Sequence, residues 1–353
     1  MENESRKKQK LENERIIFFE KLTIPQILKD EIPMNDSLIS NVKSYRRIIS
    51  NILRGIDKRI IMIVGPCSVH NIEEAKIYGN MLKSLSNEVE DKIFIIMRVY
   101  FEKPRTTNGW KGLINDPDLD ESFQVNKGIR QARELLLYLN TIGLPCAYEI
   151  LDTITPQYIS DLISWGAIGA RTTESQVHRQ IVSGLSMPVG FKNGTGGSID
   201  IALDGMISSR NPHCFMGITN LGEPSVCRTK GNPDSHIILR GGKDGPNYYE
   251  KNLDKLEEDM ELRSLNTGYI VDCSHGNSRK DYLNQPKVLD YLIKQRTSGR
   301  NKLVGIMLES NINEGKQNLN KKSELKYGVS ITDSCLSFTQ TKEIILRAYQ
   351  ELG

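Results

Sequence analysis

The segment Ile60-Ile61-Met62-Ile63-Val64-Gly65-Pro66-Cys67 contains five consecutive apolar residues, followed by a turn and a thiol. A strand that is apolar on both faces is typical of a parallel sheet buried between helices. The same unit, a short apolar run followed by a polar turn and a helix-like stretch, recurs along the rest of the chain. This alternation predicts one βα-repeating domain, which is either a (β/α)8 barrel or a doubly wound sheet.

Polar residues at the ends of the apolar runs favour the barrel. The nine runs cover residues 60–64, 93–100, 146–150, 168–171, 189–192, 215–218, 236–240, 269–273 and 303–308. Eight of them end in, or lead directly to, a residue suited to anion or metal chemistry: Cys67, Arg98, Glu149, Arg171, Lys192, Arg240, His275 and Glu309. The run at 215–218 does not, so we assign it to an inserted β-hairpin at about residues 213–232. In a barrel the carboxyl ends of the strands converge on one mouth, which a doubly wound sheet would not provide.

Helical periodicity and capping signals mark several of the connecting segments. Apolar residues at helical spacing predict an amphipathic helix at 38–54, and others predict a helix from about Val125 that stops before Gly143. Thr155-Pro156 is typical of a helix N-cap and first turn, and Gly166 is predicted to end that helix.

The domain organisation follows from the uninterrupted repeat. Residues 1–15 are a charged arm, and no low-complexity linker separates later parts of the chain. We therefore predict an N-terminal arm and helix at 1–55, with regulatory or oligomer contacts, and one catalytic barrel at 56–353.

Composition excludes several classes of protein. The 353 residues include 47 Lys and Arg against 44 Asp and Glu, a formal charge of +3, which argues against a highly basic nucleic-acid binder. No apolar run approaches the roughly 18 residues of a membrane span, and the polar start lacks a secretory signal. The six cysteines are scattered without a CxxC pair, which predicts reduced thiols in a cytoplasmic protein.

Four cations, Arg98, Arg171, Lys192 and Arg240, each close an apolar run. Each alone is explained equally well by an isolated ion pair, but four at matching positions need an anion to offset their repulsion. Guanidinium groups match carboxylate and phosphate oxygens in pairs, so we expect a small, multiply anionic ligand.

Two glycine-rich turns and one basic loop are compatible with phosphate binding. Residues 192–197 and 240–243 follow strands, and their glycines would let backbone N–H groups approach a phosphate, although glycine also simply makes turns. Residues 102–107 place two cations and two hydroxyls on one loop, which could hold a second phosphate or be an ordinary solvated loop.

A candidate metal site consists of Cys67, His275, Glu309 and Asp333. Thiolate, imidazole and two carboxylates form a mixed donor set that suits a divalent transition ion. The residues are far apart in the sequence, so Cys67 as a buried thiol and His275 as a core histidine stay open.

Six longer motifs resemble one enzyme family. They are residues 65–70 (Gly-Pro-Cys-Ser-Val-His), 97–112 (with Glu-Lys-Pro-Arg-Thr-Thr at 102–107), 169–175 (Gly-Ala-Arg-Thr-Thr-Glu-Ser), 190–195 (Gly-Phe-Lys-Asn-Gly-Thr), 238–243 (Ile-Leu-Arg-Gly-Gly-Lys) and 272–278 (Asp-Cys-Ser-His-Gly-Asn-Ser). The chain resembles the class I, feedback-regulated 3-deoxy-D-arabino-heptulosonate 7-phosphate (DAHP) synthases over roughly residues 20–350. The resemblance implies a TIM barrel, one divalent metal ion (Mn, Fe, Co or Zn) without an organic cofactor, and the first reaction of the shikimate pathway.

The resemblance also implies roles for individual residues. The implied metal ligands are Cys67, His275, Glu309 and Asp333. Phosphoenolpyruvate would be bound by Arg98, Glu149, Arg171, Lys192 and Arg240. Erythrose 4-phosphate would be bound by Lys103, Arg105, Thr106 and Asp333. Arg171, Lys192 and His275 are the implied catalytic residues, and the sequence does not decide whether Lys192 or His275 moves protons.

Members of the family are inhibited by an aromatic amino acid that binds outside the active site. The matching positions are Asn13, Ile16, Gln157, Leu185, Ser186, Phe215, Gly217 and Cys227, with the first two contributed by a neighbouring subunit of a homodimer or homotetramer. Gly217 stands where phenylalanine-inhibited members have Ser, which leaves room for a phenolic hydroxyl and favours tyrosine. A phenylalanine-inhibited enzyme is the alternative, and Gly217 could instead serve a tight strand contact.

Two other functions remain to be weighed against this one. A related synthase acting on a pentose phosphate would share the barrel and the cations, but the loop at 102–107 argues against it. A non-catalytic sensor barrel would be expected to lack one of the metal ligands, and the sequence retains all four.

Overall fold

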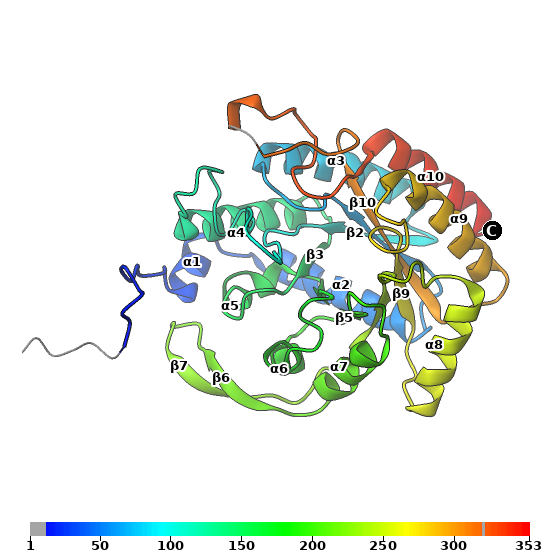
Figure 1. The fold of residues 1–353 in the computed structure, drawn as a ribbon, viewed down its shortest axis with the longest axis horizontal. Coiled ribbons are helices and arrows are strands. Elements are labelled where there is room, and N and C mark those ends of the chain that lie inside the picture. The colour runs from blue at the N-terminus through cyan, green and yellow to red at the C-terminus, as the bar shows by residue number, and fades with distance from the viewer. Residues whose placement is uncertain (1–11, 320–321) are drawn as a thin grey trace, which may run out of the picture.

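Eight parallel strands close into a barrel in the computed structural model, which describes residues 12–319 and 322–353 (Figure 1). The ring is closed because β1 pairs in parallel with both β2 and β10. The strands, in order around the barrel, are β1 (Ile60–Gly65), β2 (Ile93–Arg98), β3 (Cys146–Glu149), β4 (Trp165–Ile168), β5 (Val189–Lys192), β8 (His236–Leu239), β9 (Tyr269–Asp272) and β10 (Leu303–Asn311). A short strand, β11 (Leu336–Ser337), extends the sheet beside the end of β10. The predicted (β/α)8 barrel is confirmed.

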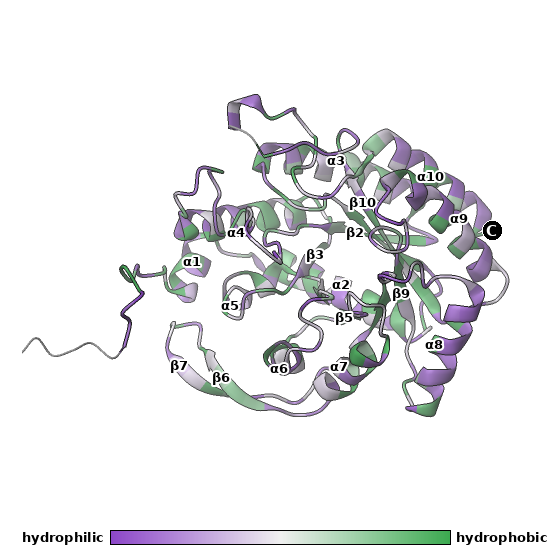
Figure 2. Cartoon of the chain, viewed as in Figure 1, coloured by the Kyte–Doolittle hydropathy of each residue, from purple (hydrophilic) through white to green (hydrophobic). Residues whose placement is uncertain are grey.

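Helices surround the barrel and turn their polar faces outward, as the purple outer surfaces of α8 and α9 in Figure 2 show. The α-helices are α1 (Pro25–Glu31), α2 (Asp36–Leu53), α3 (Ile72–Val89), α4 (Val125–Thr141), α5 (Pro156–Ile159), α6 (Gln176–Gly184), α7 (Asp200–Arg210), α8 (Glu250–Leu262), α9 (Gln285–Thr297) and α10 (Phe338–Glu351). Three single turns of 3-10 helix are η1 (Ser160–Leu162), η2 (Tyr282–Asn284) and η3 (Lys322–Glu324). The helices predicted at 38–54 and before Gly143 correspond to α2 and α4.

The apolar run at 215–218 forms a separate hairpin, as predicted. Strand β6 (Cys214–Ile218) pairs in antiparallel register with β7 (Pro224–Arg228), and neither joins the barrel sheet. The hairpin curves along the outside of the molecule below α5 and α6 (Figure 1).

The fourth barrel strand lies earlier in the chain than predicted. It covers Trp165–Ile168 instead of residues 168–171, so Arg171 belongs to the loop after the strand. Gly166, predicted to end a helix, lies inside this strand instead, where a Cβ would lie 2.7 Å from Ile150 Cδ1. The helix that begins at Pro156 ends much sooner, and Thr155 makes no side-chain capping hydrogen bond.

Alternation along the strands divides the core into two layers. In β1, Ile60, Met62 and Val64 belong to the apolar cluster between the strands and the surrounding helices. Ile61 and Ile63 point into the barrel, where they join a second cluster with Ile49, Ile52 and Leu53 of α2. Asn35 is the N-cap of α2, and its side chain accepts a hydrogen bond from Leu38 N. Through Ile49, Ile52 and Leu53, α2 supplies apolar side chains to the barrel interior.

The described residues contain no helix with the length and apolarity needed to cross a bilayer. The expected arm at residues 1–15 lies mostly outside the described part of the chain, which begins at residue 12.

Candidate active site

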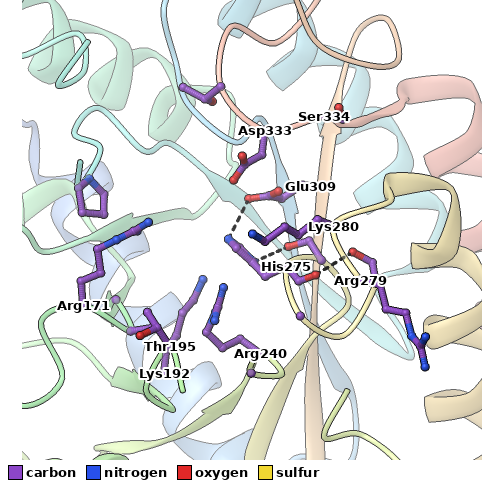
Figure 3. Close-up of a pocket in the computed structure, with 18 of the residues that line it drawn as sticks. Arg171, Lys192, Thr195, Arg240, His275, Arg279, Lys280, Glu309, Asp333 and Ser334 are labelled. Carbon is purple, nitrogen blue, oxygen red and sulfur yellow. Dashed lines mark hydrogen bonds and ion pairs between the residues drawn. The ribbon is translucent and has the colours of Figure 1, made fainter. Parts of the chain in front are cut away.

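A cavity of about 820 Å³ opens at the carboxyl ends of the barrel strands (Figure 3). Nine of the predicted site residues line it: Lys103, Arg105, Glu149, Arg171, Lys192, Arg240, His275, Glu309 and Asp333. Cys67 and Arg98 do not line the cavity; both are buried and contact residues that do. Thr106 reaches the site through Arg171, whose Nε donates a hydrogen bond of 3.2 Å to Thr106 Oγ1.

Three predicted metal ligands converge on one point. One ligand atom each from Cys67, Glu309 and Asp333 lies within 4.8 Å of the other two. Cys67 and Glu309 are buried, whereas Asp333 is exposed towards the cavity. Burial, with the nearby Glu309 carboxylate, raises the pKa of the Cys67 thiol, and the Lys103 ammonium opposes that rise. A cation at this point would favour the thiolate, so the donor chemistry fits a divalent transition ion.

His275 lies at the edge of this cluster, with Nε2 3.8 Å from Glu309 Oε1. Its backbone is left-handed, with φ of 57°, an uncommon conformation for a non-glycine residue. The carbonyl of His275 accepts a hydrogen bond of 2.7 Å from Lys280 N, which holds this turn at the end of β9. The ring thus faces the cavity between Glu309 and Lys192 (Figure 3).

Two buried carboxylates hold the cations at the base of the cavity. Arg98 Nη2 lies 3.0 Å from Glu309 Oε1, and Lys192 Nζ lies 3.0 Å from Asp272 Oδ2. Burial alone would raise the pKa of Asp272, but Lys192 and His275 hold it well below its ordinary range. Arg98 Nη1 is buried without a hydrogen-bond partner among the described residues. An orphaned guanidinium donor beside the cavity fits an anionic ligand that completes its hydrogen bonds.

Arg171 and Arg240 line the same cavity on the side of Lys192 (Figure 3). Burial lowers the pKa of Arg240, as does the neighbouring Arg171, while Asp272 opposes the shift. Glu149 is buried beside them at the end of β3, where its Oε1 would lie 2.2 Å from a Cβ built on Gly169. Three of the four predicted cations therefore line one cavity, and Arg98 lies buried behind its wall against Glu309.

The basic loop at 102–107 lies over the metal-ligand cluster. Lys103 Nζ donates hydrogen bonds to Cys67 O at 3.0 Å and to Cys67 Sγ at 3.3 Å. Arg105 Nε donates to Trp110 O at 2.8 Å, and its side chain lines the cavity. The loop is thus part of the site rather than an isolated solvated segment.

The glycine-rich turns have a packing reason for their composition. A Cβ on Gly242 would lie 2.4 Å from Gly197 Cα, so the two turns contact each other through their backbones. Thr195 and Gly242 both line the cavity, which keeps the turns beside the predicted anion site.

Sequence reasoning missed some residues of the cavity wall. Arg279, Lys280 and Lys316 line it but do not end an apolar run, so the strand-end signal could not find them. Arg279 and Lys280 both have left-handed backbones, with φ of 55° and 62°. Asp272 was missed as well, although it stands three residues before His275 in a motif that the sequence singled out.

The positions expected to bind an effector lie away from the cavity, around the hairpin. Gln157 Nε2 donates a hydrogen bond of 2.7 Å to Ile218 O, and Phe215 pairs with Cys227 across the two strands. Leu185 and Phe215 are partly buried against the core, and Ser186 is exposed beside Leu185. Asn13 and Ile16 lie on a segment that projects away from the barrel at the left of Figure 1.

Comparisons with known proteins identify the family. The family model described as DAHP synthetase I family matches residues 31–346. The Tyr-sensitive phospho-2-dehydro-3-deoxyheptonate aldolase of Escherichia coli is 48% identical over 347 residues, covering 98% of this chain and 97% of that protein. The Phe-sensitive enzyme of the same organism is 47% identical over 331 residues, covering 94% of each chain.

A solved structure of phospho-2-dehydro-3-deoxyheptonate aldolase from Francisella tularensis has the same fold. It superposes with a TM-score of 0.93 at 46% sequence identity, covering 96% of this chain and 99% of that one. The match therefore includes both the barrel and the added hairpin region. On this evidence the chain belongs to the DAHP synthetase I family.

Proposed function

We propose that this cavity condenses phosphoenolpyruvate with erythrose 4-phosphate and water, giving DAHP and inorganic phosphate, the first step of the shikimate pathway. The observation that carries the proposal is that cations and metal-donor side chains surround one cavity at the barrel mouth, with Arg98 and Cys67 buried in contact with its lining residues. The chain is accordingly a transferase whose two substrates are both phosphorylated.

Phosphoenolpyruvate is held by the cations at the base and wall of the cavity. Its carboxylate and phosphate accept hydrogen bonds from four cationic side chains, with Glu149 beside them: Arg98, Arg171, Lys192 and Arg240. The unpartnered Nη1 of Arg98 supports this assignment, because a buried guanidinium donor is costly without an acceptor. Fixing both anionic groups orients the methylene carbon towards the second substrate, and such positioning can lower a barrier by several kcal/mol.

Erythrose 4-phosphate is held by the loop over the cluster, through Lys103, Arg105 and Thr106, with Asp333 nearby. Cys67, His275, Glu309 and Asp333 are the residues that would hold a divalent ion. When bound, that ion supplies Lewis-acid polarisation of the aldehyde oxygen. Manganese, iron, cobalt and zinc all suit the mixed sulfur, nitrogen and oxygen donors.

The methylene carbon of phosphoenolpyruvate attacks the aldehyde carbon, and positive charge develops at the carbon that bears the phosphate oxygen. Water adds there, and phosphate leaves by cleavage of the carbon–oxygen bond. Lys192 and His275, both on the cavity wall, are the candidates for proton transfer. Asp272 Oδ2 lies 3.0 Å from Lys192 Nζ and 3.0 Å from His275 Nδ1, so both candidates depend on the same carboxylate.

The substrate assignment is tested by measuring phosphate release from phosphoenolpyruvate with different aldehydes. Erythrose 4-phosphate should support release with formation of the seven-carbon product, while phosphoenolpyruvate alone should not. Preference for a pentose phosphate such as arabinose 5-phosphate would instead assign the chain to a related synthase.

We further propose feedback inhibition by tyrosine at the hairpin. Gly217 supports it through its missing side chain, which leaves room for a phenolic hydroxyl. A Cβ there would also lie 2.9 Å from Cys227 Sγ, so the tight strand contact stays the alternative reason for this glycine. Asn13 and Ile16 of a neighbouring copy would complete this pocket in a homodimer or homotetramer. We place the enzyme in the cytoplasm.

The effector assignment is tested by inhibition with tyrosine, phenylalanine and tryptophan. Tyrosine should inhibit at the lowest concentration, and Gly217→Ser should weaken tyrosine inhibition about tenfold while preserving uninhibited turnover. Met216→Ser is the matched control, because the neighbouring Met216 side chain is exposed. Stronger inhibition of the unmodified enzyme by phenylalanine would reverse the assignment.

A further inference from the structure

Asp272, at the end of β9, is fully buried and contacts three other residues of the site. Its Oδ2 lies 3.0 Å from Lys192 Nζ and 3.0 Å from His275 Nδ1. Its Oδ1 accepts hydrogen bonds from Ser274 N at 3.0 Å and from Ser274 Oγ at 2.6 Å. One carboxylate thus connects a proposed metal ligand with a proposed phosphoenolpyruvate-binding cation.

These contacts determine which nitrogen of His275 carries the proton. A carboxylate only accepts hydrogen bonds, so the single hydroxyl proton of Ser274 is donated to Asp272. Ser274 Oγ also lies 2.7 Å from His275 Nδ1, and with its proton already donated it can only accept there. Asp272 Oδ2 and Ser274 Oγ can therefore both only accept a hydrogen bond from Nδ1, so Nδ1 must carry the proton.

In the neutral ring, the lone pair is then on Nε2. Nε2 lies on the side of Glu309, at 3.8 Å from Oε1, where the thiol and carboxylate donors converge. A neutral imidazole with an unprotonated Nε2 is the form of histidine that binds a metal ion.

From this geometry we propose that Asp272 is a positioning residue that fixes the Nδ1–H tautomer of His275 for metal binding and holds the Lys192 ammonium beside the same ring. The inference rests on the proposed function, because it concerns how the proposed metal ligand is prepared. Asp272 itself is not among the residues that line the cavity. Outer hydrogen-bond partners of this kind typically change metal affinity by 10–100-fold when they are removed.

The first test titrates the metal-free full chain with cobalt(II) alone and follows the absorption of the cobalt–thiolate bond. Asp272→Asn should weaken cobalt binding about 10–100-fold relative to the unmodified chain. Lys192→Met should leave cobalt affinity within about twofold, because Lys192 Nζ pairs with Asp272 and, among the described residues, makes no ion pair with a proposed ligand. Unchanged affinity in Asp272→Asn, or an equal loss in Lys192→Met, would overturn the proposal.

A reference variant separates this inference from the proposed function. Cys67→Ser should abolish the cobalt–thiolate absorption. If the unmodified chain shows no such absorption, the proposed metal site itself is wrong. If the absorption is present and Asp272→Asn retains full affinity, only the positioning role fails.

A second measurement does not depend on the stability of any Asp272 variant. Nitrogen-15 NMR of the histidine rings in the metal-free unmodified chain distinguishes protonated from unprotonated ring nitrogens. The His275 signals, assigned by their absence in His275→Gln, should show a protonated Nδ1 and an unprotonated Nε2. The opposite tautomer would overturn the proposal.

Discussion

Glu309 joins the two halves of the candidate site through a single side chain. It accepts a hydrogen bond from Arg98 while its carboxylate lies within 4.8 Å of ligand atoms from Cys67 and Asp333. Asp272 has a similar double role towards Lys192 and His275. Because breaking a buried pair leaves a charge without a partner, changes at either carboxylate should affect stability as well as activity.

Arg171 offers a cleaner test of anion binding, because its side chain is exposed on the cavity wall. Arg171→Ala should lower kcat/KM for phosphoenolpyruvate about 100-fold or more, because charge-assisted hydrogen bonds to the anion are lost. The free energy of unfolding should stay within about 0.5 kcal/mol of that of the unmodified chain, as for most surface changes. Arg47→Ala, an exposed change on α2, is the control, and near-normal turnover by Arg171→Ala would refute the assignment.

Glu102 should make stability depend on pH. The residue is buried and accepts a hydrogen bond from Tyr148, and burial raises the pKa of its carboxyl from 4.5 to about 7. A raised pKa in the folded state stabilises the protein below pH 4.5, and this stability is lost as the pH rises through about 7. The loss amounts to about 3 kcal/mol, because each tenfold difference in proton affinity between the folded and unfolded chain corresponds to roughly 1.4 kcal/mol.

Glu102→Gln should therefore flatten the dependence of the denaturant midpoint on pH between about 4.5 and 7. Glu134→Gln, which changes an exposed residue of α4, should leave that dependence as it is. Parallel curves for the unmodified chain and Glu102→Gln would show that Glu102 does not titrate in this range.

At the level of single residues, the sequence predicted the site residues that end an apolar run. It missed residues that only position another side chain of the site. The four cations and Cys67, His275 and Glu309 could be found because each ends or follows a strand, and parallel strands bring their carboxyl ends together. Asp333 lies on the loop before β11, where no strand-end signal marks it. Asp272 also ends a strand, but its role depends on the side-chain directions of Lys192 and His275, which no sequence pattern specifies. Lys316 comes from a long loop whose path could not be predicted.

Among the elements, α2 contributes to the barrel interior and was predicted from its helical periodicity. Ile49, Ile52 and Leu53 pack in one cluster with Ile61 and Ile63 of β1. The position of strand β4 was predicted wrongly because glycine commonly ends a helix. In the structure, Gly166 lies within the strand and allows close packing against Ile150. Periodicity in the sequence identifies the helices and strands. Packing between neighbouring strands decides whether a glycine lies within a strand or ends the element before it.

Truncating the buried face of α2 should destabilise the whole chain. Ile52→Ala should cost about 2–5 kcal/mol, because the fully buried side chain leaves a cavity. Ile39→Ala, on the exposed face of the same helix, should cost about 0.5 kcal/mol or less. Denaturant midpoints measure both values, and equal midpoints would mean that α2 does not stabilise the barrel.

For the molecule as a whole, a formal charge of +3 conceals a strongly uneven distribution. Lys103, Arg105, Arg171, Lys192 and Arg240 all line one cavity, together with Lys243, Arg279, Lys280 and Lys316. Acidic residues elsewhere offset them in the sum. The nine cations outnumber the four carboxylates on the same wall, Glu149, Asp244, Glu309 and Asp333. An excess of positive charge on a concave wall raises the local concentration of anionic substrates.

Catalytic efficiency should therefore fall with salt. Raising the ionic strength from about 0.1 M to about 1 M shortens the Debye length from about 10 Å to about 3 Å. We expect kcat/KM for phosphoenolpyruvate to fall about tenfold over this range. Lys243→Gln should reduce the salt dependence, and Lys58→Gln, just before β1 at the opposite end of the barrel, should not. A salt-independent kcat/KM would argue against electrostatic attraction at the mouth.

The proposed function requires that one cavity combines anion-binding and metal-binding residues. The most direct test measures phosphate release from phosphoenolpyruvate and erythrose 4-phosphate after treatment of the enzyme with a chelator. The metal-free enzyme should release no phosphate, and addition of manganese(II) or cobalt(II) should restore release together with DAHP formation. Undiminished release by the enzyme from which all metal has been removed would contradict the account.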